Sequence, residues 1–233
     1  VFVSTKEIQP MKKLQLIALL FFMTFLAQAE NPEKTIDALL QKFSGNVPGA
    51  TVMVIKDGKP LFAKAYGLAN LEKKIPCTTN TNFRLASVTK QFTAMSIMIL
   101  AERGKLSLAD KLSKFFPEFP EYGKDITLQH LLTHTSGLLD YEEVMPANVT
   151  IPLADRDVLW IMCQQDHLEF SPGKKFHYSN TAYSLLSLIV EAASGQKFAK
   201  FLKANIFQPL GMKDSLAYEP GISVVPNRAY GYL

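Results

Sequence analysis

One segment constrains the fold of this chain more than any other. Residues 91–106, QFTAMSIMILAERGKL, are apolar on nearly every face of a helix between Phe92 and Leu100. A helix that is apolar all round belongs in a packed core. Arg103 and Gly104 then supply stop signals. The chain must therefore surround this helix with other elements, and its 48% hydrophobic and 20% charged residues suit a globular protein.

The rest of the chain supplies those elements. NPEKTIDALLQKFSG predicts a helix that Asn31 could cap, and GATVMVIKDGKPLFAKAYG predicts two strands joined at Asp57 and Gly58. A loop through LEKKIPCTTNTN then leads to Ser87. After residue 90 the pattern is mostly helical, and one helix, NTAYSLLSLIVEAASG, has Asn180 as a natural cap. This order predicts an α+β fold with its helices segregated.

The N-terminal region resembles an export signal. Two lysines follow Met11, an apolar run spans Leu14–Leu26, and AQA has the small-x-small pattern of a cleavage site. The run is short for a membrane span, so we expect a cleaved signal peptide rather than an uncleaved anchor. We expect the following segments: upstream non-native sequence 1–10, signal peptide 11–29, and one domain 30–233, subdivided into a helix and hairpin 31–80, a mainly helical part 81–218 and an end 219–233.

Export implies a periplasmic or secreted protein with no stable membrane anchor after cleavage. The formal charge of +4 falls close to neutrality once residues 1–29 are removed, and no basic stripe indicates a nucleic-acid partner. An oxidising compartment would allow Cys77 and Cys163 to pair. We favour two buried thiols, since cysteine is among the most buried residue types.

Ser87 and Lys90 form an S-x-x-K pair at the start of the apolar helix. Residues three apart share a helix face, yet a cation is disfavoured near a helix N-terminus. The position of Lys90 becomes useful if Ser87 is a nucleophile, because the lysine could then relay the proton of the serine hydroxyl. The alternative is an N-cap serine beside a lysine that extends to water.

The segment SPGKKFHYSNTAYSLL places Tyr178 and Asn180 just ahead of a second helix. Tyr178 could serve as a general base or proton relay for Ser87, and Asn180 could hydrogen-bond to a substrate. The alternative makes Asn180 a helix cap and Tyr178 a packed aromatic residue with a wet hydroxyl.

A third segment, LLTHTSGL, offers weaker candidates. His130 and His134 are four apart, but no glutamate follows His130 and no third metal ligand is evident. Ser136 lacks the G-x-S-x-G surroundings of a nucleophile elbow. We interpret this stretch as a structural loop and expect neither a metal nor a cofactor.

Taken in order, SVTK, LLTHTSGL, F-x-PG-x-x-x-x-YSN and IFQPLGM resemble the serine β-lactamase-like, penicillin-recognising family. The likeness covers about Thr35 to Tyr232 and is closest to the class C β-lactamase, D-alanyl carboxypeptidase and esterase branch. It implies a β-lactamase/transpeptidase-like α+β fold. It also implies acyl transfer with Ser87 as nucleophile, Lys90 and Tyr178 in proton transfer, and Asn180 in substrate binding.

Members of that family continue into further strands, which carry a lysine- or histidine-x-glycine motif and one oxyanion donor. We therefore expect an incomplete antiparallel sheet, with the C-terminal strands missing, and a chain of low activity by itself. The expected substrate is a lactam, a D-amino-acid or peptidoglycan-like peptide or amide, or an ester. The alternative is a catalytically impaired homologue with a binding role or none, and the oligomeric state stays open.

Overall fold

The computed structural model describes residues 32–146, 149 and 151–232, so the upstream segment and signal peptide predicted for 1–29 lie outside it. The described chain divides into two compact units. The first joins the residues up to 83 to residues 227–232, and the second contains residues 84–226.

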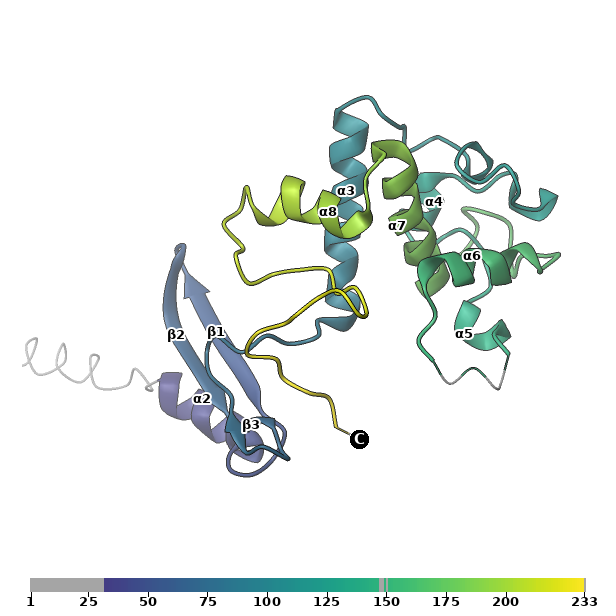
Figure 1. Ribbon diagram of the computed structural model, residues 1–233. Coiled ribbons are helices and arrows are strands. Elements are labelled where there is room, and N and C mark those ends of the chain that lie inside the picture. Colours follow the sequence, from purple (N-terminus) through teal and green to yellow (C-terminus); the bar gives the residue numbers. More distant parts are fainter. Residues whose placement is uncertain (1–31, 147–148, 150, 233) are drawn as a thin grey trace, which may run out of the picture. The chain divides into compact units, whose positions relative to one another are not determined.

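The first unit is built on a helix and a hairpin (Figure 1). Helix α2 (Pro32–Leu40) continues into the short η2 (Gln41–Phe43), and strand β1 (Ala50–Lys56) pairs antiparallel with β2 (Lys59–Tyr66). The turn residues Asp57 and Gly58 both have positive φ, 51° and 72°. A two-residue turn of that kind matches the twist of the flanking strands, which confirms the predicted hairpin.

A second, smaller sheet follows the hairpin. Strand β3 (Leu68–Asn70) pairs antiparallel with β4 (Ile75–Pro76), so part of the stretch expected to be a loop is strand. The Tyr232 hydroxyl accepts from the Leu71 amide at 2.8 Å and donates to the Glu72 carboxylate at 2.8 Å. These bonds fasten the end of the described chain to the β3–β4 turn.

The second unit is helical. Its elements, in chain order, are η3 (Ala86–Thr89), α3 (Lys90–Glu102), η4 (Leu112–Lys114), η5 (Glu121–Gly123), α4 (Leu128–Leu132), α5 (Tyr141–Val144), α6 (Asp155–Cys163), α7 (Asn180–Ser194), α8 (Phe198–Leu202) and the π-helical η6 (Lys203–Phe207). Helix α7 packs against α3, α4, α6 and α8 (Figure 1). It is therefore the central helix of this unit.

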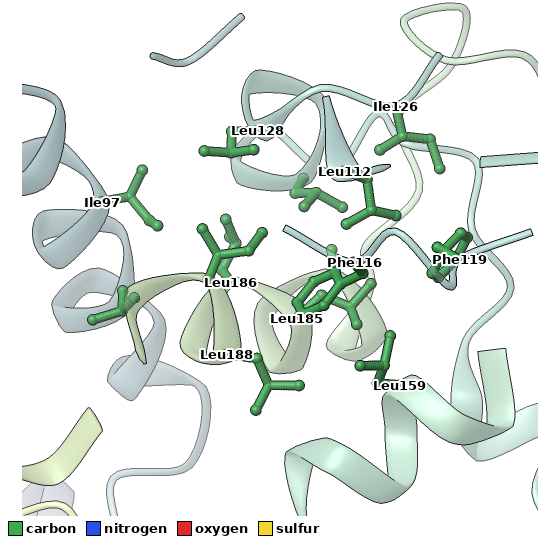
Figure 2. Packing of buried hydrophobic residues seen from close by; sticks show 14 of the residues in the cluster. Ile97, Leu112, Phe116, Phe119, Ile126, Leu128, Leu159, Leu185, Leu186 and Leu188 are labelled. Atoms are coloured by element: carbon green, nitrogen blue, oxygen red, sulfur yellow. The ribbon is translucent and has the colours of Figure 1, made fainter. Parts of the chain in front are cut away.

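The core of the second unit lies around α7. Leu185 and Leu186 are fully buried, and Figure 2 shows them among side chains from the surrounding helices, including Ile97 of α3, Leu128 of α4 and Leu159 of α6. Burying one such leucine is worth about 1.5–3 kcal/mol relative to leaving it exposed. This packing fixes the start of α3 relative to the start of α7.

Helix α3 corrects one expectation. Ile97 and Leu100 are buried, but Met95 and Met98 are 52% and 47% exposed, so the helix is not buried on every face. The reason is geometric, because residues 97 and 100 share the face that meets α7, whereas 95 and 98 lie on other faces. The helix ends at Glu102, as Arg103 and Gly104 predicted.

Both cysteines are free thiols, as we favoured. Cys77 is buried, whereas Cys163 is only partly buried, and burial raises the pKa of each thiol. Among the described residues, no helix has the length and apolar character needed to cross a membrane.

Candidate active site

Ser87 lies exposed in the helical turn that leads into α3. Its predecessor Ala86 has a φ of 46°, a left-handed conformation that is uncommon for any residue other than glycine. Strained backbone of this kind clusters at functional sites, where the surrounding structure holds it in place. The alternative reading of Ser87 as a cap is wrong, because the caps of η3 and α3 are Leu85 and Thr89.

Lys90 is the first residue of α3, but η3 adds a helical turn before it, and its own amide donates to the Ser87 carbonyl. The lysine is thus one turn inside the helical segment, where the dipole penalty is weaker. Its Nζ lies 3.2 Å from Ser87 Oγ and donates to Asn180 Oδ1 at 2.8 Å. It also lies 4.7 Å from the centre of the Tyr178 ring. The ammonium therefore has two oxygen acceptors and an aromatic neighbour, and the side chain is only partly buried.

Tyr178 completes the group around the serine. Its hydroxyl donates to Ser87 Oγ at 2.6 Å, and the side chain is 42% exposed. Hydrogen bonding to the Lys90 ammonium and then to Ser87 lowers the pKa of the Tyr178 phenol below its ordinary value. A phenol so placed can exchange a proton with the serine hydroxyl, because the neighbouring cation stabilises the phenolate form.

Asn180 is the first residue of α7, but it does not cap that helix. Ser179 is the cap, and its Oγ accepts from the Ala182 amide at 3.0 Å. The expected capping role of Asn180 was therefore wrong by one residue. Since Ser179 satisfies the helix end, the Asn180 side chain is available to bridge Lys90 and Glu142, whose Oε1 accepts from Asn180 Nδ2 at 3.3 Å.

The start of α7 is also bonded to the segment that leads into α5. The Asn180 amide donates to Asp140 Oδ2 at 2.9 Å, and the Thr181 hydroxyl donates to the Leu139 carbonyl at 2.9 Å. The same hydroxyl accepts from the Tyr141 amide at 2.8 Å. These bonds hold Glu142 beside Asn180 at the edge of the site.

The segment interpreted as a structural loop begins with α4 and then bonds to the site. His130 belongs to the capping box of α4, where its Nδ1 accepts from the Thr127 amide at 3.2 Å. Ser136 is 1% exposed, and its Oγ accepts from the Leu138 amide, so this hydroxyl is not presented to a substrate. His134 accepts from the Ser179 amide and stacks on Tyr178. No group of three or more His, Cys, Asp or Glu that could hold a metal occurs among residues 32–146, 149 and 151–232.

The structure thus brings all four residues singled out from the sequence, Ser87, Lys90, Tyr178 and Asn180, into one hydrogen-bonded cluster. Sequence reasoning missed the contributions of His134 and Glu142. The only available signal was the position of His134 in a T-H-T-S-G stretch, and nothing in the pattern around residue 142 indicated a contact across the site.

Comparison with known proteins gives a consistent result. The model of the β-lactamase family matches residues 33–232. Penicillin-binding protein 4* of Bacillus subtilis (strain 168) is 39% identical over 188 residues, which are 78% of this chain and 41% of that protein. The chain therefore spans about two fifths of that curated relative.

Solved structures share the fold. Penicillin-binding protein from Bacillus halodurans matches with a TM-score of 0.73 and 36% identity, over 88% of this chain and 61% of that one. D-amino acid amidase from Ochrobactrum anthropi SV3, complexed with L-phenylalanine amide, matches with a TM-score of 0.69 and 27% identity, over 84% of this chain and 55% of that one.

The described helices and small antiparallel sheets are those of the β-lactamase/transpeptidase-like fold. On the family match, the fold and the order of its motifs, this chain belongs to the β-lactamase family, a family of serine hydrolases.

Proposed function

We propose that this chain carries the nucleophile, proton relay and amide-binding group of a serine acyl-transfer hydrolase. One observation carries the proposal: Ser87 Oγ lies 2.6 Å from the Tyr178 hydroxyl and 3.2 Å from Lys90 Nζ. A serine hydroxyl needs an adjacent base to become a nucleophile. Tyr178 is that base when its phenol is ionised, and Lys90 stabilises the phenolate.

The reaction begins when Ser87 Oγ attacks the carbonyl carbon of an amide, lactam or ester, while Tyr178 takes the hydroxyl proton. The carbon–nitrogen or carbon–oxygen bond then breaks, and the proton passes to the leaving group. An acyl ester remains on Ser87 until water attacks the same carbon and regenerates the hydroxyl. The Ser87 amide, in the first helical turn where amides lack intrahelical partners, is the oxyanion donor that this chain contributes.

Asn180 supports this chemistry from the side of the substrate. Its Oδ1 accepts from Lys90, and its Nδ2 faces Glu142. The amide therefore keeps the ammonium oriented toward Ser87, and it is placed to donate to a substrate carbonyl. The substrate classes that suit this arrangement are lactams, D-amino-acid or peptidoglycan-like peptides and amides, and esters.

The first experiment asks for a covalent acyl-enzyme on the full chain. The protein is incubated with a chromogenic cephalosporin or with p-nitrophenyl acetate, and its intact mass is followed over hours, with peptide mapping of the modified residue. We expect one acyl group on Ser87, and none on that residue in Ser87→Ala. The exposed serine at position 113 gives a matched control, because Ser113→Ala should acylate as the wild type does.

A Tyr178→Phe variant tests the relay. Removal of a general base slows proton transfer about 10²–10⁴-fold, so acylation should slow by that factor while Ser87 remains the modified residue. An unmodified wild-type mass, or an adduct that persists in Ser87→Ala, contradicts the proposal. Ligand binding that survives Ser87→Ala without any adduct would favour the non-catalytic binding role instead.

We also propose that the protein is exported through the segment 11–29, on the pattern of lysines, apolar run and AQA. N-terminal sequencing of material from the periplasm or medium should begin at Glu30. A mature N-terminus upstream of Leu14 would contradict cleavage.

A further inference from the structure

The segment after α4 contains a histidine that the chemistry above does not use. Three consecutive residues that include the proposed base contact His134. The His177 amide donates to the His134 carbonyl at 2.9 Å, the Tyr178 ring stacks on the imidazole with centres 4.7 Å apart, and the Ser179 amide donates to Nδ1 at 3.1 Å. One histidine thus holds the base through its ring and through the backbone on both sides.

We propose that His134 is a positioning residue that holds the Tyr178 hydroxyl against Ser87. This inference rests on the proposed function. Tyr178 is 42% exposed, so burial alone does not fix the direction of its ring. The stacked imidazole restricts the ring, and the two backbone bonds restrict the segment that carries it. The 2.6 Å separation between the phenol and Ser87 Oγ follows from both restraints.

The imidazole is itself held in place. Its centre lies 5.0 Å from that of Tyr183, whose hydroxyl donates to the Leu132 carbonyl at 3.0 Å. The His134 backbone has a φ of 57°, so the chain adopts a left-handed conformation in order to present this ring and carbonyl. Such strain is kept only where the surrounding contacts determine the conformation.

The ring acts in its neutral form. Nδ1 accepts a backbone hydrogen bond, so the single proton is on Nε2. Burial, and then the charge of Lys90, lowers the pKa of His134 below its ordinary value, which agrees with that tautomer. A protonated imidazole would lose the Ser179 bond and add a second positive charge near Lys90.

Three variants separate the contacts. His134→Phe keeps a stacked ring but loses the Nδ1 acceptor. His134→Asn keeps an acceptor and tolerates positive φ but loses the ring, and His134→Ala loses both. The control is Phe176→Ala, which removes a 70% exposed ring that meets the imidazole only at its edge. Rates are compared for variants that retain the wild-type urea midpoint, a condition that His134→Asn is best placed to meet.

The first readout is the rate constant for acylation of Ser87 at saturating p-nitrophenyl acetate. A displacement of about 1 Å in a reacting group costs on the order of 10²-fold in rate, so we expect that loss in His134→Ala. We expect smaller losses in His134→Phe and His134→Asn, and a wild-type rate in Phe176→Ala. Wild-type rates in folded His134→Ala and His134→Asn would overturn the proposal.

The second readout does not depend on activity. The phenol pKa of Tyr178 is followed by NMR of ring-labelled tyrosine, with assignment by Tyr178→Phe. If His134 holds the phenol beside Lys90 and Ser87, the pKa rises toward its ordinary value in His134→Ala and stays low in Phe176→Ala. An unchanged Tyr178 pKa in His134→Ala overturns the positioning role even if acylation fails in the wild type. Absent wild-type acylation with the expected pKa rise would refute the proposed function alone.

Discussion

At the scale of the residue, the site shows how one cation is accommodated near a helix start. Lys90 has a hydroxyl oxygen, an amide oxygen and the Tyr178 ring around its ammonium. These contacts replace water around the charge, and the turn before α3 moves the lysine away from the helix end. The observable consequence is a lowered pKa of Tyr178, because the ammonium favours the phenolate form of that residue.

Replacement of Lys90 by methionine should reverse that shift. The Lys90 hydrogen bond is the largest cause of the lowered Tyr178 pKa, so Lys90→Met should raise the pKa toward the ordinary phenol value. NMR titration of ring-labelled tyrosine measures it. The control is Lys105→Met, which removes an equal charge from the segment just after α3 and should leave the titration of Tyr178 unchanged. A Tyr178 pKa that does not move in Lys90→Met contradicts the assigned cause.

His177, which precedes Tyr178, gives a prediction for how stability depends on pH. His177 Nδ1 donates to the Glu169 carboxylate, and this hydrogen bond, followed by the charge of Glu169, raises the His177 pKa. A raised histidine pKa stabilises the fold fully below the unfolded value of about 6.5, and the contribution is lost as pH rises through the folded value. Glu169→Gln should therefore lower the urea midpoint at pH 5.5 and have little effect at pH 8.5.

The pair formed by Asp166 and His167 is the comparison for that experiment. Its side chains are 95% and 65% exposed, against 29% for Glu169 and 46% for His177. Exposed ion pairs are worth little, so Asp166→Asn should change the midpoint less than Glu169→Gln at pH 5.5, and neither variant should change it much at pH 8.5. A loss in Glu169→Gln that grows as the pH rises would contradict the assigned sign.

At the scale of the element, two adjacent residues at the start of α7 have different roles, one in capping the helix and one in the candidate site. Ser179 satisfies the helix amides, and Asn180 faces the site. A serine N-cap contributes about 1 kcal/mol relative to alanine, and glycine in its place costs only a few tenths. The helix end and the site are therefore separable by mutation.

We expect Ser179→Ala to lower the free energy of unfolding by about 0.5–2 kcal/mol, and Ser179→Gly by a few tenths. Urea denaturation followed by circular dichroism measures both. Both changes remove the same hydroxyl, but glycine is tolerated at an N-cap position and alanine is not. The comparison therefore separates the loss of capping from the loss of packing. Equal losses in the two variants would show that the buried Ser179 hydroxyl acts through something other than the cap.

Local sequence patterns predicted the turns and helix ends more reliably than they predicted the role of an individual residue. The Asp57–Gly58 turn and the Arg103–Gly104 stop depend on backbone preferences that sequence displays directly. The cap of α7 was missed by one residue because both Ser179 and Asn180 are good caps, and only tertiary contacts to Lys90 decide between them.

The site itself was predicted in part. Spacing placed Ser87 near Lys90, the segment before the second helix offered Tyr178 and Asn180 as candidates, and family resemblance then favoured all four together. Spacing could not show that His134 reaches Tyr178 across more than forty residues, because that contact depends on how α4 packs against α7. The same reason explains why α3 is exposed on one side. A run of apolar residues does not show which face of the helix a neighbouring element will cover.

At the scale of the whole molecule, the two units differ in how deeply they are packed. The second has a continuous core around α7, whereas the hairpin of the first leaves Met53, Ile55 and Leu61 more than half exposed. A two-stranded sheet without further partners is marginal in water. Stability should therefore be uneven along the chain.

Hydrogen exchange followed by mass spectrometry should show that difference. We expect amides in the buried part of α7, residues 185–190, to exchange far more slowly than those of β1 and β2, because their opening requires disruption of the core. Peptides from α3 serve as an internal reference, since that helix is buried on one side only. Equal protection in the hairpin and α7 would contradict this order.

The packing of α3 against α7 has a consequence for how the proposed reaction could evolve. The Ser87 hydroxyl, which we propose as the nucleophile, comes from the turn entering α3, and the Tyr178 phenol comes from the segment entering α7. Their separation therefore depends on how α3 packs against α7, in addition to the His134 contacts that hold the phenol. A methyl group gained or lost between these helices would change the distance between the two hydroxyl groups. If the proposed acyl transfer is correct, substitutions at buried leucines between α3 and α7 would therefore alter its rate without contacting the substrate.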